Sequence, residues 1–198
     1  MPKAYTQNIL RVYDRATPEE IKAGINWYAL ARQECQRIAR DYDLPLDTVV
    51  GVVAALSPNN KWTRNIKDAD ELIRVYQAGL PVDQATVCTY NTMRQKAWDI
   101  LSQQVSDRPR VMDILNGQKI KTFAECILGE DTCVIDGHAY NIAHGKRLTL
   151  NGGGINIGKK LYAELQHRYQ RAAKLRDLKT YEMQAITWTT WRRVHSIT

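Results

Sequence analysis

The sequence lacks any long hydrophobic run: no stretch of its 198 residues approaches the roughly 18–20 apolar residues that a membrane-spanning helix needs. The first residues, 1–15, lack the hydrophobic segment and small-residue cleavage site of a secretory signal, so we expect a cytoplasmic protein that is not secreted. The four cysteines form no C-x-x-C pair, which argues against zinc ribbons and iron–sulfur clusters. We therefore expect buried thiols in a reducing compartment.

Acidic residues are scarce in the last quarter of the chain, although the whole chain carries a net charge of only +7. Residues 146–198 hold 11 Lys and Arg residues against 3 Asp and Glu residues. A local excess of positive charge suits a polyanion such as DNA or RNA. A solvated basic helix face gives the same composition, so charge alone leaves both interpretations open.

Strand signals are also scarce, whereas helix signals are frequent. Residues 17–20, Thr-Pro-Glu-Glu, combine a hydroxyl cap, a proline and two acids, as is typical of a helix start; we expect this helix to reach about residue 42. The apolar run 48–56 fits a buried helix or a buried strand, and a helix is favoured because no partner strand is evident nearby. Further helices are expected over 63–77, 89–104, 110–115, 119–128, 136–143, 158–175 and 180–195. The sequence predicts an all-α fold of about nine helices.

We expect a single compact helical domain, 1–198, built as two lobes. One lobe, 48–145, carries the motifs described next, and residues 1–45 and 155–198 pack as the second lobe. The glycine-rich stretch 151–154 is the best internal boundary.

The most informative segment is 115–142, which reads LNGQKIKTFAECILGEDTCVIDGHAYNI. Asn116 and Gly117 predict a turn between two short helices. Backbone N–H groups at the start of the second helix would then point outward, where such groups bind phosphate oxygens without recognising base sequence. A short apolar link leads on to Asp136, Gly137 and His138.

This segment resembles the helix-hairpin-helix DNA glycosylase superfamily, which includes endonuclease III-like enzymes. Residues 115–122, LNGQKIKT, match the family's hairpin motif L-P-G-x-G-x-K-T, and residues 135–138, IDGH, match its V-D-x-H motif. Upstream, residues 55–59, ALSPN, are similar to the L-S-x-Q segment that supplies a wedge beside a flipped base. Together these motifs cover roughly residues 48–145, and the flanking helices look like a small phage-encoded branch. The sequence departs from the pattern at Asn116 for Pro, Lys119 for the second hairpin Gly and Asn59 for the wedge Gln.

The resemblance implies that Asp136 is the catalytic carboxylate of an N-glycosidic bond cleavage. Such cleavage develops positive charge on the sugar, which a fixed carboxylate stabilises while it orients a water molecule. Val134 and Ile135 would limit the solvation of this carboxylate. An aspartate directly before a helix is also the usual N-cap, and the two roles are compatible.

Lys121 occupies the position at which bifunctional members of the superfamily keep an amine nucleophile. A desolvated lysine there can attack the sugar C1′ and form a Schiff base, which would add lyase activity. Lys119 is a competing candidate. Positions i and i+2 do not share a helix face, so the two lysines cannot both point into one pocket. A surface lysine on an exposed helix face is the alternative for either residue.

The resemblance and the basic C-terminal helices also indicate residues that would contact double-stranded DNA. His138 could instead be a structural histidine or brace Asp136, the two asparagines before Trp62 could be plain cap chemistry, and Arg192 and Arg193 could be solubilising charge. Trp188 and Trp191 are expected in the core. The expected DNA-contacting residues are Gly117, Gln118, Lys119, Asn59, Asn60, Trp62, His138, Tyr140, Arg192 and Arg193.

The sequence contains no motif that indicates another kind of chemistry. The four histidines are scattered without an H-E-x-x-H pattern, so we expect no metal, and no cofactor is indicated. Gly152–Gly154 lack the strand before them and the Lys-Ser/Thr after them that a phosphate-binding NTPase loop needs. No obligate protein partner is inferred. Three hypotheses remain: a DNA glycosylase-like enzyme, a non-catalytic helix-hairpin-helix DNA-binding protein, and a helical interaction protein with an accidental motif match.

Overall fold

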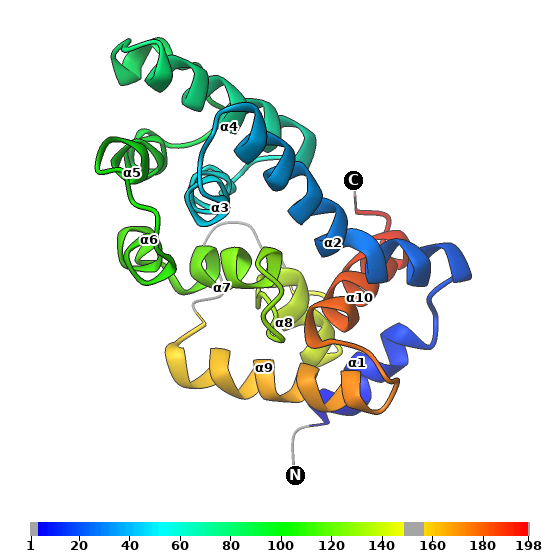
Figure 1. Cartoon of the computed structure of the whole chain (residues 1–198). Helices are drawn as coiled ribbons and strands as arrows, with labels where there is room; N and C mark the ends of the chain where they lie inside the picture. The colour runs from blue at the N-terminus through cyan, green and yellow to red at the C-terminus, as the bar shows by residue number, and fades with distance from the viewer. Residues whose placement is uncertain (1–3, 149–156, 198) are drawn as a thin grey trace. The chain divides into compact units, whose positions relative to one another are not determined.

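The computed structural model of the chain describes residues 4–148 and 157–197 (Figure 1). In these residues it contains ten α-helices and one short 3-10 helix. The expected glycine-rich boundary at 151–154 lies outside the described residues.

The first helices are α1 (Tyr5–Tyr13), α2 (Pro18–Asp41), α3 (Leu46–Ala55) and α4 (Trp62–Gln77), followed by the 3-10 helix η1 (Val82–Gln84). The central helices are α5 (Asn91–Ser102), α6 (Arg108–Leu115) and α7 (Gln118–Ile127). The last three are α8 (Gly137–His144), α9 (Lys159–Lys174) and α10 (Thr180–Val194).

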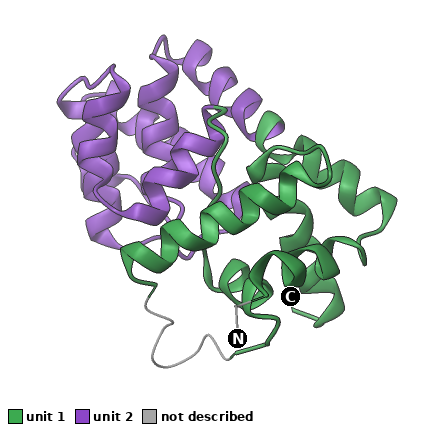
Figure 2. Ribbon diagram, turned by 90° about the horizontal axis from the view of Figure 1, so that it is seen from below, with its two compact units in different colours: residues 1–29, 129–198 green, residues 30–128 purple. Residues whose placement is uncertain are grey.

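The described residues group into two compact units, coloured separately in Figure 2. Unit 1 comprises residues 1–29 and 129–198, and unit 2 comprises residues 30–128. The expected lobes also join the two ends of the chain, but they place 30–45 with the chain ends and 129–145 with the motif-bearing lobe, whereas 30–45 belongs to unit 2. In the structure, 129–145 belongs with the terminal segments, so Asp136 is part of unit 1 and the Asn116–Gly117 turn is part of unit 2.

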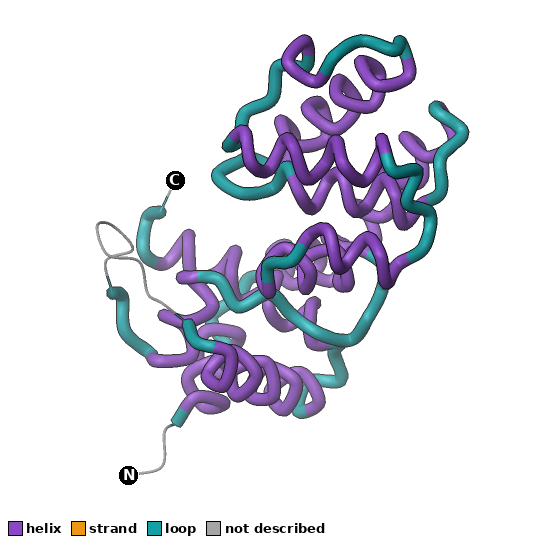
Figure 3. The backbone as a smooth tube through the Cα atoms, turned by 90° about the vertical axis from the view of Figure 1, so that its left-hand side faces the viewer, coloured by secondary structure: helices purple, strands orange, loops and turns teal. Residues whose placement is uncertain are grey.

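The all-α prediction is confirmed for the described residues, none of which lies in a strand (Figure 3). The ambiguous run 48–56 is helical, as part of α3. Helix α1 was missed because no side chain caps its start at Ala4. The spacing of its buried residues Tyr5, Ile9 and Val12 is the signal that would have revealed it.

Unit 2 is built around α3, which explains the nearly continuous apolar sequence of this helix. Four other helices of the unit, α4, α5, α6 and α7, contact α3. Every residue from Thr48 to Ala55 is buried. A helix that is covered on all sides needs no polar stripe, so the usual amphipathic pattern is absent.

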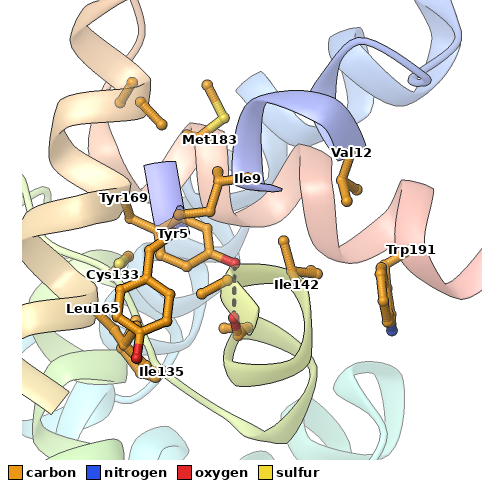
Figure 4. Close-up of a cluster of buried hydrophobic side chains, with 14 of the residues drawn as sticks. Tyr5, Ile9, Val12, Cys133, Ile135, Ile142, Leu165, Tyr169, Met183 and Trp191 are labelled. Atoms are coloured by element: carbon orange, nitrogen blue, oxygen red, sulfur yellow. Dashed lines mark hydrogen bonds between the residues drawn. The ribbon is translucent and has the colours of Figure 1, made fainter. Parts of the chain in front are cut away.

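Unit 1 has its core between α1, α8, α9 and α10 (Figure 4). Ile9, Ile142, Leu165 and Met183 contribute one side chain from each of these helices, and all four are fully buried. The core therefore joins a helix from the N-terminal end of the chain to three helices that follow residue 136.

Candidate functional site

Asp136 is the N-cap of α8, in extended backbone conformation directly before the helix. Its Oδ1 accepts a hydrogen bond of 2.8 Å from the backbone N–H of Ala139. The N-cap prediction is thus confirmed. The carboxylate is half-buried, and it follows the buried residues Val134 and Ile135, as expected.

Helix α9 holds the segment that carries Asp136. The Gln166 side chain donates to the Cys133 carbonyl over 3.1 Å, and the Ile135 N–H donates to the Tyr162 hydroxyl over 3.1 Å. On the same face, the Tyr169 hydroxyl donates to the Ala139 carbonyl over 3.2 Å. Burial raises the pKa of Tyr169 well above its ordinary value, so the hydroxyl keeps the proton that this bond requires. Asp136 therefore sits on a backbone fixed on both sides.

The second oxygen of Asp136 is bound by Trp188 of α10. The indole Nε1–H donates to Asp136 Oδ2 over 3.2 Å. The rings of His138 and Trp188 meet in a T-shaped contact with centroids 5.9 Å apart, and the Arg192 guanidinium lies over the Trp188 ring at 4.6 Å. Asp136, His138, Trp188 and Arg192 form one cluster of half-buried side chains, which we call the Asp136 cluster.

Three of these four residues were expected site residues, and the structure brings them together. Trp188 was expected in the core, and it is the member that sequence analysis missed. The signal was weak, because a tryptophan at i−3 from another tryptophan reads as a packing stripe. Within the described residues, the buried Nδ1 of His138 has no hydrogen-bond partner.

Tyr140 lies on α8 outside this cluster, where its ring stacks on His144 with centroids 3.8 Å apart. His144 Nδ1 lies 2.8 Å from the Tyr140 carbonyl, and its Nε2 lies 3.2 Å from the Tyr5 hydroxyl. The half-buried Tyr140 ring thus packs on the last turn of α8.

Arg193 was expected to contact DNA, but its guanidinium is bound inside unit 1. Its Nε lies 2.7 Å from Glu20 Oε1, and its Nη2 donates to the Arg15 carbonyl over 2.7 Å. Because Glu20 is only 9% exposed, its carboxylate depends on this partner. Arg193 therefore has a structural role in unit 1, and its contact with DNA stays a prediction.

In unit 2, α6 and α7 form the expected helical hairpin, joined by Asn116 and Gly117. Asn116 adopts the left-handed conformation with φ 48°, and Gly117 is the extended N-cap of α7. A Cβ at Gly117 would lie 3.2 Å from Ile120 Cγ1, so a larger residue would press on the first turn. No side chain caps the start of α7, whose first N–H groups lack partners within the helix.

The lysines of the hairpin differ in exposure. Lys119 is exposed beside Gln118, which is also exposed, whereas Lys121 is half-buried. A third lysine, Lys96 of α5, donates to the Leu115 carbonyl over 2.7 Å and so satisfies the end of α6. The tip of the hairpin therefore combines uncapped backbone N–H groups with the exposed positive charge of Lys119.

The joint between α3 and α4 contains Asn59, Asn60 and Trp62. Asn59 is exposed with φ 53°, and its side-chain amide donates to the Tyr90 hydroxyl. Asn60 is half-buried and donates to Asp68 Oδ2 over 2.9 Å. The ring of Trp62 meets Phe123 of α7 edge-on, with centroids 6.4 Å apart, so it packs within unit 2.

The carboxylate that orders this joint, Asp68, was not anticipated. It is 1% exposed and accepts hydrogen bonds from Asn60, from Arg64 Nε at 2.6 Å and from the Cys88 N–H at 2.7 Å. Arg64 and Asp68 stand at i and i+4 on α4, a pairing that sequence spacing could have suggested. The contact with Cys88 fixes the 57–61 joint against the 85–90 loop and has no local sequence signal.

The cysteines follow the expected burial except for one. Cys35, Cys126 and Cys133 are buried, whereas Cys88 is exposed, against the prediction of buried thiols. Burial, reinforced by the negative charge of Glu34, raises the pKa of the Cys35 thiol to about 12.

Within residues 4–148 and 157–197, no three His, Cys, Asp or Glu side chains are grouped as a metal site. No helix in that part of the chain is both long and apolar enough to cross a membrane.

The fold and site define an all-helical protein with a capped, tryptophan-bound aspartate in one unit and a lysine-bearing helical hairpin in the other. The chain belongs to the family of unknown function DUF7178, which matches residues 1–195. No curated protein and no solved structure matches the chain.

Proposed function

We propose that the protein is a DNA glycosylase-like enzyme of the helix-hairpin-helix type. It binds double-stranded DNA through the α6–α7 hairpin, flips a damaged or modified nucleotide out of the duplex, and cleaves its N-glycosidic bond with Asp136. The observation that carries the proposal is the geometry of Asp136. A half-buried carboxylate held by two N–H donors follows a rigid backbone link, in the motif that the superfamily uses for catalysis.

The hairpin supports DNA binding. Its two-residue turn leaves the start of α7 without a side-chain cap, next to the exposed Lys119. Phosphate oxygens accept hydrogen bonds from such N–H groups and are attracted by the helix dipole and the lysine charge. This contact carries no base information, so it suits an enzyme that must grip any sequence around a lesion.

In the proposed reaction, the C1′–N bond breaks and the base leaves with its electron pair. Asp136 stabilises the positive charge that develops on the sugar. A water molecule oriented by the carboxylate adds its oxygen to C1′, and the proton that it loses balances the charge of the departing base. Each Asp136 oxygen already accepts one hydrogen bond but has a second lone pair for this water.

Lys121 is the proposed nucleophile if the enzyme is bifunctional. Its Nζ would attack C1′ and displace the base, and opening of the sugar ring would give an imine. Lys121 is half-buried whereas Lys119 is exposed, and Lys121 occupies the position of the amine nucleophile in the superfamily motif, so we prefer Lys121 for this role.

A specific observation also favours the alternative of a non-catalytic DNA-binding protein. Both oxygens of Asp136 are engaged within the protein, as a purely structural cap would be. In that case the hairpin would still bind DNA, but no base would be released.

The test is a screen of duplexes that each carry one modified base, with release of the free base as the readout. The proposal expects release from at least one duplex. Borohydride reduces an imine to a stable amine and so traps a covalent protein–DNA adduct. An adduct that is lost in Lys121→Ala would establish Lys121 as the nucleophile. Release without any adduct would assign water as the nucleophile. Salt-dependent DNA binding with no release from any duplex would establish the non-catalytic alternative.

A further inference from the structure

We propose that Trp188 is a positioning residue for Asp136, and that its indole N–H sets the plane of the carboxylate that acts on the sugar. This inference rests on the proposed function, because it assigns a second residue to the same reaction. Trp188 does not match any of the three motifs that indicated the site, and its role follows from the contacts of unit 1 alone.

Two donors from different helices hold the carboxylate. The Ala139 N–H of α8 binds Oδ1, and the Trp188 indole of α10 binds Oδ2. A carboxylate held at one oxygen can still rotate about its last side-chain bond, for which the torsional preference is broad. A second donor at the other oxygen removes that freedom, so the plane of the group is fixed before substrate binds.

The indole is itself held in place. The Arg192 guanidinium covers the ring at 4.6 Å, one helical turn further along α10, and its Nε donates to the Ile197 carbonyl over 3.3 Å. The T-shaped contact with His138 supports the ring from α8. Because the ring contacts both Arg192 and His138, the direction of the N–H bond is set by packing as well as by Asp136.

Trp191, one turn away on α10, shows what a packing tryptophan in this protein looks like. It is 5% exposed and belongs to the hydrophobic core of unit 1. Its Nε1 is buried and has no hydrogen-bond partner among the described residues. Trp191→Phe is therefore a matched control, because it removes an indole from the same helix without removing a donor to Asp136.

The experiment combines single-turnover base release with the indole region of a nitrogen-15 correlation spectrum. Trp188→Phe keeps a ring for Arg192 and His138 to contact but has no N–H. We expect it to lower the release rate about 10- to 100-fold, as misplacement of a catalytic group does, with DNA affinity unchanged. Trp191→Phe should change the rate less than about threefold, within the range of an indirect packing change.

The spectrum tests the contact without any substrate. The chain has 5 tryptophans, and the indole signal lost in Trp188→Phe identifies Trp188. Asp136→Asn replaces a charged acceptor by a neutral one, so the Trp188 signal should move upfield more than the other indole signals. A shift that is equal for all indoles would contradict the hydrogen bond.

The outcomes separate this inference from the proposed function. Equal loss of rate in the two tryptophan variants, or full activity of Trp188→Phe, would overturn the positioning role while leaving the enzyme assignment intact. Absence of base release by the wild-type protein would overturn the enzyme assignment and the positioning role with it. In that case a selective indole shift would leave Trp188 as a partner of a structural cap.

Discussion

Arg193 in the last turn of α10 binds Glu20 in the first turn of α2, with 2.7 Å between Nε and Oε1. The same carboxylate accepts hydrogen bonds from the Thr17 N–H at 2.9 Å and from the Thr190 hydroxyl at 3.2 Å. One buried carboxylate thus completes the cap of α2 and ties α10 to it. The ion pair of Arg193 with Glu20 thus joins the two ends of the chain inside unit 1, and no local sequence pattern predicts it.

The first prediction concerns this carboxylate. The Arg193 hydrogen bond holds the pKa of Glu20 below its ordinary value of 4.5, against the opposing effect of burial. A lowered folded-state pKa means that the stabilisation is present above 4.5 and is lost as the pH falls through the folded-state value. Glu20→Gln should lower the free energy of unfolding by about 1 kcal/mol at neutral pH, a modest value because Arg193 is half exposed.

Urea unfolding of wild type and Glu20→Gln at about pH 7 and about pH 3 measures this difference. The difference in the free energy of unfolding between the two proteins should be smaller at the lower pH, because stabilisation that comes from a lowered pKa is lost as the pH falls. Glu19→Gln, at the exposed neighbouring position, is the control and should have the same free energy of unfolding as wild type at both pH values. A gap that stays constant between the two pH values would contradict the account.

The second prediction concerns the contact of α2 with α10 at Gly24. A Cβ there would lie 2.7 Å from the Ile186 nitrogen and 2.8 Å from its Cα, and backbone atoms cannot move aside cheaply. Gly24→Ala should lower the free energy of unfolding by about 2 kcal/mol, although alanine is the better helix former. Gly158→Ala, at the N-cap of α9 where a Cβ meets nothing within 4 Å, should lower it less than Gly24→Ala does, because only a cap preference is lost. Thermal unfolding of both variants tests this prediction. Equal melting temperatures for Gly24→Ala and Gly158→Ala would show that the helices are not closely packed at Gly24.

The third prediction concerns the hairpin tip. Lys119→Ala should weaken binding to an unmodified duplex and should reduce the slope of log affinity against log salt by about one, since one phosphate contact is lost. Lys67→Ala removes another exposed lysine, from α4, and serves as the control. Fluorescence anisotropy over a range of salt concentrations gives both slopes. The same slope for Lys119→Ala and wild type would remove the hairpin from the DNA-binding surface.

The sequence predicts the local features of this protein well. Cap and proline signals at 17–20 place the start of α2, and the Asn116–Gly117 turn and the Asp136 cap lie where the motifs indicate. Each of these depends on interactions between residues a few positions apart, which sequence spacing records directly. Helix α1 is not predicted from the sequence, because its burial pattern is the only signal and no side chain caps its start.

The contacts that define the Asp136 cluster could not be predicted in the same way. Trp188 and Asp136 are 52 positions apart, and Glu20 and Arg193 are 173 apart. Whether a tryptophan packs in the core or donates to a carboxylate depends on how α8 and α10 meet. That relation is a property of the packed core of unit 1, so Trp188 and Trp191 look alike in the sequence and differ in the structure.

The central claim is that Asp136 acts in the chemical step and that the hairpin, not Asp136, supplies DNA affinity. The most direct measurement is single-turnover release of the modified base by Asp136→Asn, with the dissociation constant determined on the same duplex. The account predicts a fall in rate of at least about 100-fold with an unchanged dissociation constant, because asparagine still caps α8 but cannot stabilise the sugar cation. Base release by Asp136→Asn at the wild-type rate would contradict it.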